Sequence, residues 1–428
     1  MDRSLVAVLA GTFTLRFSTG LTGAMLGLYL ADLPEHGGQP VDATIVGLFA
    51  ATFYLAELVL SPIFGILSDR LGHHRVMLYG PVFGGIAVVL TGLTTQLPIL
   101  GATRLLEGAS TAASVPSILG FIALATAGNE LLRGRAAARF EGATLAGLGV
   151  GFIVAPKLFE AIGPTAFFLN ALIYGVSFLI YLGGVKDPAG EREAVAARHV
   201  GFSRYLELVR SAHVLLLAPT WIAVNASIGL WFSQSLFQFS QPNPDFPEQV
   251  LMRGFDANQI TLAAIAIAVV FGAGLLYWGN RFKSMRRTTI ILYGILGGAV
   301  LVGAGLGVNH SGGLPAIVPL GAGLLAGAGL FVLAGATPAA LGLLADISER
   351  FPGDRGAIMG LYSVFLAIGQ ISGSLIGGVA ADWGGIDGML LATFALLGVA
   401  LVPLSRLREQ EHHIDGVESP AFLGDAPP

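Results

Sequence analysis

The chain has 428 residues, of which 54% are hydrophobic and 12% are charged. Soluble domains carry about 25% charged residues, so this composition excludes an ordinary soluble fold. There are no cysteines, which excludes disulfides and thiolate chemistry, and the net charge of −4 is spread over short loops and indicates no nucleic-acid partner. None of the eight histidines has a metal-ligand spacing within a helix, so we assign no metal and no cofactor.

Twelve apolar stretches follow one another along the chain, and each is close to the length of about 20 residues that a membrane-spanning helix needs. They are residues 5–30, 43–67, 76–95, 98–126, 140–163, 165–184, 214–240, 259–280, 288–309, 315–345, 357–381 and 386–404. The first is too long for the apolar region of a signal peptide and lacks a small-residue cleavage site, so we interpret it as a retained helix. The pattern predicts an all-α membrane protein with twelve transmembrane helices.

Basic residues indicate which ends of these helices face the cytoplasm. They follow every even-numbered stretch, at Arg70 and Arg75, Arg133, Arg135 and Arg139, Lys186 to Arg210, Arg281 to Arg287, Arg350 and Arg355, and Arg406 and Arg408. The loops after odd-numbered stretches are acidic, with Arg253 as their single basic residue. Because cytoplasmic loops are rich in Lys and Arg, we expect a multi-pass protein of the inner (cell) membrane with both termini in the cytoplasm.

The longest hydrophilic stretch divides the helices six and six. We expect an N-terminal six-helix bundle (1–184), a cytoplasmic linker (185–213), a C-terminal six-helix bundle (214–405) and a disordered cytoplasmic tail (406–428). The second part of the linker, residues 202–210, is amphipathic and is expected to lie along the membrane interface.

The two halves share an internal repeat. A shift of 222 residues places Pro116 on Pro338, Arg133-Gly134 on Arg355-Gly356, Gly147 on Gly369, Gly151 on Gly373 and Gly163 on Gly385. The matches keep the same topological positions, which favours two pseudo-symmetric bundles over coincidence in a glycine-rich chain. Parallel repeats of this kind place the substrate site near the midplane, between the halves. The small residues spaced by four at 147–155 and 369–377 predict close helix crossings, either sliding or static.

The segment after the second stretch carries a family resemblance. Residues 65–75 read Gly65-Ile66-Leu67-Ser68-Asp69-Arg70-Leu71-Gly72-His73-His74-Arg75. This resembles the signature of the major facilitator superfamily, Gly-x-Leu-x-Asp-Arg-x-Gly followed by basic residues in the same loop. The resemblance implies that superfamily's fold and a cytoplasmic gate motif made of Gly65, Asp69, Arg70, Gly72 and Arg75. It also implies that Asp69 caps the N-terminal end of a neighbouring helix, the stretch 357–381, in one transport state.

Two further segments bear on the subclass. Arg104-Leu105-Leu106-Glu107-Gly108 resembles the superfamily's Arg-x-x-x-Gly motif, which is linked to proton transfer. The resemblance is nearest to the drug:proton antiporters with twelve helices. Their Gly-x-x-x-Gly-Pro-x-x-Gly-Gly motif is degraded here, where Ala155 replaces a glycine and Lys157 follows Pro156.

Five ionisable residues lie at membrane depth, where such groups are costly and mark functional sites. They are Arg16, Glu57, Arg104, Glu107 and Lys157. We interpret them as candidate proton-coupling and cavity charges, and for Glu107 we expect a proton affinity that depends on its distance from Arg104. The alternative is a set of satisfied ion pairs that only fix helix packing, and Lys157 could extend outward to the interface.

The second half has only neutral polar stripes within its helices. The candidate substrate-binding residues there are Asn225, Trp231, Gln234, Gln238 and Gln370. We therefore expect the N-terminal half to handle protons and the C-terminal half to bind the uncharged part of a solute. The balance of Arg16, Arg104 and Lys157 against Glu57 and Glu107 leans slightly toward an anionic or zwitterionic solute.

These observations predict a secondary active transporter that moves a small organic solute by alternating access. We expect the transport to be proton-coupled efflux. One alternative is a proton-coupled uptake symporter for an anionic or zwitterionic metabolite. Another is a non-transporting relative that acts as a sensor or assembly factor. The sequence shows no nucleophile–base pair or phosphate-binding loop, so we do not expect an enzyme. The expected partners are the solute, protons and the lipid bilayer, and we expect a monomer.

Overall fold

The computed structural model describes residues 3–126, 130–186, 212–349 and 355–415. Within these ranges every regular element is a helix, and a single bridge pairs Pro242 with Arg253 in the loop between α10 and α11. The first half contains α1 (Arg3–Ala31), η1 (Leu33–His36), α2 (Ala43–Leu71), α3 (His73–Met77), α4 (Tyr79–Leu93), α5 (Leu97–Ala125), α6 (Glu130–Ile162), η2 (Gly163–Thr165) and α7 (Ala166–Gly184). The second half contains α10 (Ala212–Ser240), η3 (Val250–Met252), α11 (Ala257–Gly279), η4 (Asn280–Lys283), α12 (Arg287–Asn309), α13 (Ile317–Leu333), α14 (Ala336–Glu349) and α15 (Arg355–Asp415).

All twelve apolar stretches predicted from the sequence fall on helices. The stretch 315–345 is divided between α13 and α14, and α15 covers two stretches because the chain turns at Gly384 and Gly385. Gly385 has φ 59°, a left-handed conformation that suits glycine. By length and apolar composition, nine segments of the described chain could cross a membrane, and two of them, Arg135–Gly184 and Ser363–Glu409, each hold two predicted stretches. The fold class is thus confirmed, while the count of twelve stays a prediction.

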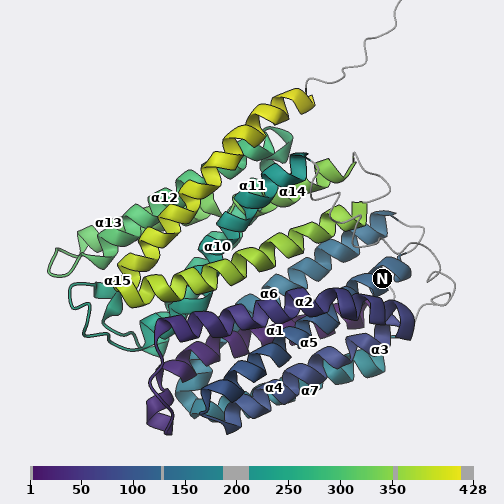
Figure 1. The fold of residues 1–428 in the computed structure, drawn as a ribbon, viewed down its shortest axis with the longest axis horizontal. Helices are drawn as coiled ribbons and strands as arrows, with labels where there is room; N and C mark the ends of the chain where they lie inside the picture. The colour runs from purple at the N-terminus through teal and green to yellow at the C-terminus, as the bar shows by residue number, and fades with distance from the viewer. Residues whose placement is uncertain (1–2, 127–129, 187–211, 350–354, 416–428) are drawn as a thin grey trace, which may run out of the picture.

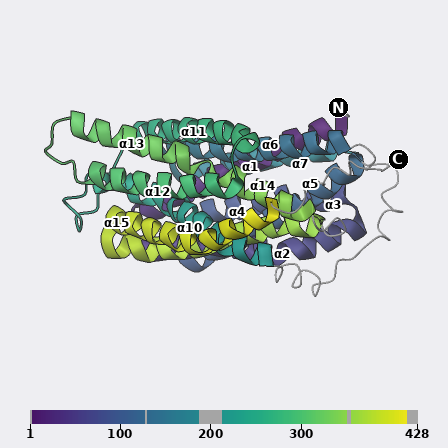
Figure 2. The ribbon, with the colours of Figure 1, turned by 90° about the horizontal axis from the view of Figure 1, so that it is seen from above.

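The helices form two groups that lie side by side (Figure 1). Helices α1 to α7 make one group and α10 to α15 the other. Seen from above, the helices of both groups run along the long axis of the molecule (Figure 2). Four helix pairs join the groups: α2 with the first half of α15, α1 with α10, α6 with α11, and α2 with α10. The domain boundaries predicted from the sequence remain predictions. Residues 187–211 of the predicted linker, with its amphipathic segment, lie outside the described residues.

Glycines set the closest helix crossings, as their spacing predicted. A Cβ atom built on Gly147 of α6 would lie 2.6 Å from the carbonyl oxygen of Phe13 in α1. One built on Gly369 of α15 would lie 2.8 Å from the carbonyl oxygen of Ile222 in α10. Real side chains do not fit at such distances, so both crossings require glycine. The same crossing therefore occurs in each half, which supports the internal repeat.

The distribution of polar and apolar side chains is that of a membrane protein. Leu276 and Leu324 are 74% and 78% exposed on the outside of the helix groups. Thr12, Asn170 and Gln234 are completely buried between helices. In lipid, exposed leucines cost nothing, and polar groups must find partners inside the protein.

The C-terminal tail differs from its prediction. Helix α15 continues to Asp415, so residues 406–415 are helical rather than disordered. The reason is that Leu404 and Leu407 are buried in the apolar core of the second half, which holds the last turns of the helix in place. Residues 416–428 lie outside the described residues.

Candidate functional site

The centre of the first half contains a buried ion pair within α5. Arg104 and Glu107 are three residues apart on one face of the helix, and they are 7% and 2% exposed. The Arg104 guanidinium donates to Oε2 of Glu107 and lies 4.8 Å from the ring centroid of Phe53. Among the described residues, Nε of Arg104 and Oε1 of Glu107 have no hydrogen-bond partner. The pair is therefore only partly satisfied, which is costly for charges at this depth.

Arg16 of α1 lies beside this pair. Its guanidinium is buried and approaches the hydroxyl of Thr111 in α5 at 3.5 Å. It interacts electrostatically with two carboxylates, Glu57 of α2 and Glu141 of α6. Arg16 thus connects three helices of the first half by charge.

Glu57 is brought to this depth by a close crossing of α2 and α5. A Cβ atom built on Gly108 would lie 2.3 Å from the carbonyl oxygen of Phe53 and 3.1 Å from the backbone nitrogen of Glu57. The Tyr54 side chain is within electrostatic range of Arg16, Arg104 and Glu57. Four of the five ionisable residues predicted from the sequence therefore lie together, and we call Arg16, Glu57, Arg104, Glu107 and Glu141 the charge cluster.

Glu141 is a member of the charge cluster that the sequence reasoning missed. It follows Arg133, Arg135 and Arg139 near the start of its helix, and it was not one of the candidates predicted from the sequence. A signal was present, however, because residues 141, 144, 148 and 151 lie on one side of α6. That side packs on α1: a Cβ atom on Gly20 of α1 would lie 2.4 Å from the carbonyl oxygen of Leu148.

Lys157 does not join the charge cluster. Its ammonium group donates to Glu160 at 2.7 Å, and both side chains are exposed toward the outer end of α6. The outward alternative considered for Lys157 fits this geometry. The lysine and the glutamate three residues later neutralise each other at the helix surface.

The five candidate residues for substrate binding serve different contacts. Asn225 donates to the carbonyl of Trp221 at 2.9 Å, and the Trp231 indole donates to Thr393 at 2.9 Å. Gln234 donates to the carbonyl of Ala43 in the other half at 2.9 Å, and Gln238 donates to Gln234 at 3.4 Å. Gln370 is buried, and its Oε1 has no hydrogen-bond partner among the described residues. Their role in substrate binding stays a prediction, and Gln370 alone among the five has a buried side-chain oxygen with no hydrogen-bond partner among the described residues.

The gate motif lies at the end of α2. Gly72 has φ 98° and closes the helix by donating its N–H to the carbonyl of Ser68 at 3.0 Å, a conformation that glycine adopts without strain. Asp69 is exposed and lies 3.9 Å from the imidazole of His73. Arg70 and Arg75 are exposed, and Gly65 lies near Pro116. Residues 350–354, just before α15, lie outside the described chain, so the capping role of Asp69 stays a prediction.

A family model with the description "Major Facilitator Superfamily" matches residues 8–329. The chain belongs to this superfamily. Its fold and its class as a membrane transporter follow from that membership, and the resemblance read from residues 65–75 is confirmed.

Relatives within the superfamily are similar over most of their length. Multidrug resistance protein 1 of Bacillus subtilis (strain 168) is 26% identical over 369 residues, which covers 84% of this chain and 87% of that protein. Quinolone resistance protein NorA of Staphylococcus aureus (strain MSSA476) is 21% identical over 395 residues, which covers 89% of this chain and 91% of that protein.

Two solved structures are similar in fold. The nucleoside transporter NupG has a TM-score of 0.71 at 14% sequence identity and covers 96% of this chain and 99% of its own. The human organic anion transporter MFSD10 (TETRAN) has a TM-score of 0.60 at 19% identity, and the match covers 95% of this chain and 99% of that transporter's chain. At these identities the likeness concerns the fold alone.

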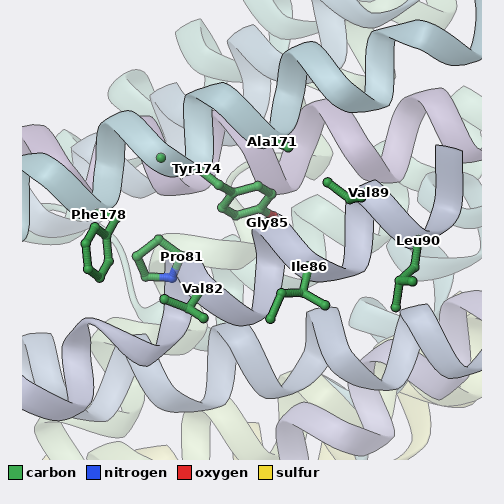
Figure 3. Close-up of a pocket in the computed structure, with 10 residues that line it drawn as sticks. Pro81, Val82, Gly85, Ile86, Val89, Leu90, Ala171, Tyr174 and Phe178 are labelled. Atoms are coloured by element: carbon green, nitrogen blue, oxygen red, sulfur yellow. The ribbon is translucent and has the colours of Figure 1, made fainter. Parts of the chain in front are cut away.

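A groove of about 390 Å³ lies between α4 and α7. Figure 3 shows Tyr174 of α7 directed toward Gly85 of α4, with Val82 and Ile86 beside it. The lining is apolar, and Val82 and Ile86 are exposed on the outside of the helices. In a membrane transporter this groove faces lipid, so we do not assign the solute to it.

Proposed function

We propose that the protein is a proton-coupled exporter of small organic molecules that works by alternating access in the inner membrane, as a monomer with both termini in the cytoplasm. The names of the relatives, multidrug resistance protein and quinolone resistance protein, support export. The observation that carries the proton coupling is the buried Arg104–Glu107 pair with one free carboxylate oxygen.

The chemistry of this pair suits a proton carrier. Burial disfavours the charged carboxylate and a neighbouring guanidinium favours it, so a small movement between the two changes proton affinity. Arg104 is held over the ring of Phe53, which belongs to α2. A rocking of α2 against α5 would therefore alter the contact between Arg104 and Glu107. In this proposal Glu107 carries the proton, and Arg16, Glu57 and Arg104 tune its release.

The charge balance supports a different solute than the sequence alone suggested. Lys157 is neutralised by Glu160, and Glu141 adds a negative charge beside Arg16. The cluster then has two arginines against three glutamates. This balance favours a cationic or neutral solute over the anionic or zwitterionic metabolite of the symport alternative. In the second half, Gln370 is our candidate for contact with the uncharged part of the solute.

Transport in liposomes that carry a pH gradient tests this proposal. A pH-sensitive dye reports proton movement while lipophilic cations, anions and sugars are added in turn. We expect cations to collapse the gradient, and Glu107→Gln to abolish the effect. Glu160→Gln is the matched control, because it removes a carboxylate that is exposed and lies outside the charge cluster.

Each result has a defined meaning. Proton movement that persists at the parent rate in Glu107→Gln would remove Glu107 from the coupling step. Exchange of labelled solute without proton movement would leave a uniporter or solute exchanger, with a structural charge cluster. No exchange of any solute class would favour the sensor or assembly factor instead.

A further inference from the structure

The two halves meet most specifically at one helix end. The first half of α15 runs antiparallel to α2, and the two lie side by side (Figure 1). At the end predicted to face outward, Asp382 of α15 accepts hydrogen bonds from the backbone N–H groups of Ala43 and Thr44, at 2.8 and 2.9 Å. The Thr44 hydroxyl donates to the same carboxylate at 2.5 Å. One side chain of the second half thus caps a helix of the first.

The capping of α2 is divided between the halves. A helix leaves its first four N–H groups without partners inside the helix. Asp42, the N-cap residue from the same half as α2, accepts from Ile45 through its side chain, and its carbonyl accepts the first bond of the helix itself, from Val46. The N–H groups of Ala43 and Thr44, which have no partner inside the helix, are bound by Asp382. They lose these partners whenever the outer ends of the halves separate.

Close packing surrounds this cap. A Cβ atom on Gly47 would lie 2.2 Å from the carbonyl oxygen of Ser374, and one on Gly378 would lie 2.6 Å from that of Ala43. Gln234 of α10 donates to the carbonyl of Ala43 at 2.9 Å. The outer ends of α2, α10 and α15 are therefore joined in this conformation.

We propose that Asp382 is the latch that holds the outer side of the transporter closed. This inference rests on alternating access, which is part of the proposed function. Charge-assisted hydrogen bonds and the positive N-terminal end of α2 both favour the carboxylate at this position. Both forces act only while the halves touch, so they stabilise one transport state and not the other.

The latch has a counterpart at the opposite end of the same helix pair. Asp69 lies in the last turn of α2, the end opposite to the one that Asp382 caps. The family resemblance assigns to Asp69 the capping of that second helix. Because the helices are antiparallel, each would carry one aspartate near its end that caps the start of the other. A rocking motion that opens the outer end would then exchange the Asp382 cap for the Asp69 cap.

Cysteine labelling from the outside tests the latch without any solute or proton. The chain has no cysteines, so Leu236→Cys supplies a single thiol in the outer seam, where Leu236 is buried against Gly27. The probe is a membrane-impermeant maleimide added outside intact cells. In this background we expect Asp382→Ala to raise the labelling rate about 2- to 30-fold, the factor by which losing a helix cap shifts an equilibrium.

Asp42→Ala is the matched control, because it removes a cap from the same helix end but leaves the contact between the halves intact. We expect its labelling rate to stay within about twofold of the parent rate, since the seam is not released. A parent-like rate in Asp382→Ala would overturn the latch, and so would equal acceleration by Asp42→Ala, which would indicate fraying of α2. If Asp382→Ala does not fold, Thr44→Val removes one bond from the other partner, and an unchanged rate there also overturns it.

The outcome is independent of the solute and of the coupling ion. A protein that moves no protons in liposomes still shows the latch if labelling accelerates in Asp382→Ala. Conversely, an unchanged labelling rate leaves the proton-coupling test of Glu107→Gln untouched. Failure of the latch and failure of the proposed function are thus separate results.

Discussion

Arg16 and Asn225 occupy equivalent positions in the two halves of the molecule. A Cβ atom built on Gly147 would lie 2.9 Å from the Cβ of Arg16, and one built on Gly369 would lie 2.5 Å from the Cβ of Asn225. The same close crossing therefore presents a guanidinium in the first half and an amide in the second. This asymmetry within a symmetric frame supports the proposed division between a charged half and a neutral half.

The crossing can be tested by adding a single methyl group. We expect Gly147→Ala to lower the free energy of unfolding by about 1–3 kcal/mol, because overpacking forces α6 away from α1. Gly149 lies two residues away, with nothing within 4 Å of its added Cβ. Gly149→Ala should be neutral or stabilise by up to about 1 kcal/mol, since alanine favours helix. Thermal melting followed by the fluorescence of the four tryptophans measures both.

The second half should respond in the same way. Gly369→Ala is expected to destabilise about as much as Gly147→Ala, within about 1 kcal/mol, because the space at the two glycines is equally limited. If only one of the two alanine variants has a lower free energy of unfolding, then only one of the two crossings is tight in the membrane. Equal losses in Gly147→Ala and Gly149→Ala would show that packing against α1 is not the cause.

The Arg104–Glu107 pair predicts a strong dependence between two substitutions. Arg104→Ala alone leaves a buried carboxylate without its partner, and we expect a loss of about 3–5 kcal/mol in the free energy of unfolding. The double variant Arg104→Ala with Glu107→Ala removes both charges and should recover a large part of that loss. The melting of the parent, of Arg104→Ala, of Glu107→Ala and of the double variant gives the interaction energy as a double-mutant cycle. Additive losses would argue that the two side chains do not interact in the membrane.

Much of the fold could be predicted from the sequence because membrane helices have a strong one-dimensional signal. Length and apolar composition located every predicted helix, since a span must satisfy its backbone internally and be apolar outside. The spacing by three between Arg104 and Glu107 was sufficient to place them on one face. The tight crossings at Gly147 and Gly369 also followed from spacing alone.

Other parts of the site depend on three-dimensional contacts that helical periodicity does not contain. Periodicity gives the face of the helix on which Lys157 lies, but not the direction in which its long side chain extends. That direction is set by its ion pair with Glu160. Trp231 lies on a polar stripe, yet its indole binds Thr393, which is 162 residues away in the chain. In the sequence, Asp382 is one of the acidic residues that follow an odd-numbered stretch. Its role as a cap is visible only when α2 lies beside it.

Substitutions of Trp231 and Gln370 should differ in their effect on the KM of transport. We expect Trp231→Phe to destabilise by about 1 kcal/mol through loss of its hydrogen bond, with KM unchanged. Thr393→Val removes the other end of the same bond and should behave alike. Gln370→Ala should instead raise KM about 2- to 10-fold, because we propose that its free carbonyl oxygen binds solute. An unchanged KM in Gln370→Ala would remove Gln370 from the substrate site.

Glu141 predicts a change in the pH dependence of transport. Arg16 interacts with both Glu57 and Glu141, so the two carboxylates compete for one positive charge. The other ionisable side chains on the described helices that pack on α6 are Arg3 and Tyr29 of α1, Arg104 and Glu107 of α5, Tyr174 and Tyr181 of α7, and Tyr277 of α11. In Glu141→Gln the field of Arg16 acts on Glu57 alone, and a neighbouring negative charge is gone. Both changes favour the charged form of Glu57.

Glu107, the proposed proton carrier, belongs to the same cluster and loses the same neighbouring negative charge in Glu141→Gln. Its charged form is therefore favoured as well, and it binds its proton only at lower pH. We therefore expect the pH of half-maximal proton-coupled transport to fall by about half a unit to one unit in Glu141→Gln, the size of one screened charge interaction. Rates measured across a pH series in liposomes give this midpoint, and Glu160→Gln on the same helix should leave it unchanged. A midpoint that stays in place, or one that rises, would separate Glu141 from the charge cluster and return the charge balance of the cavity to neutral.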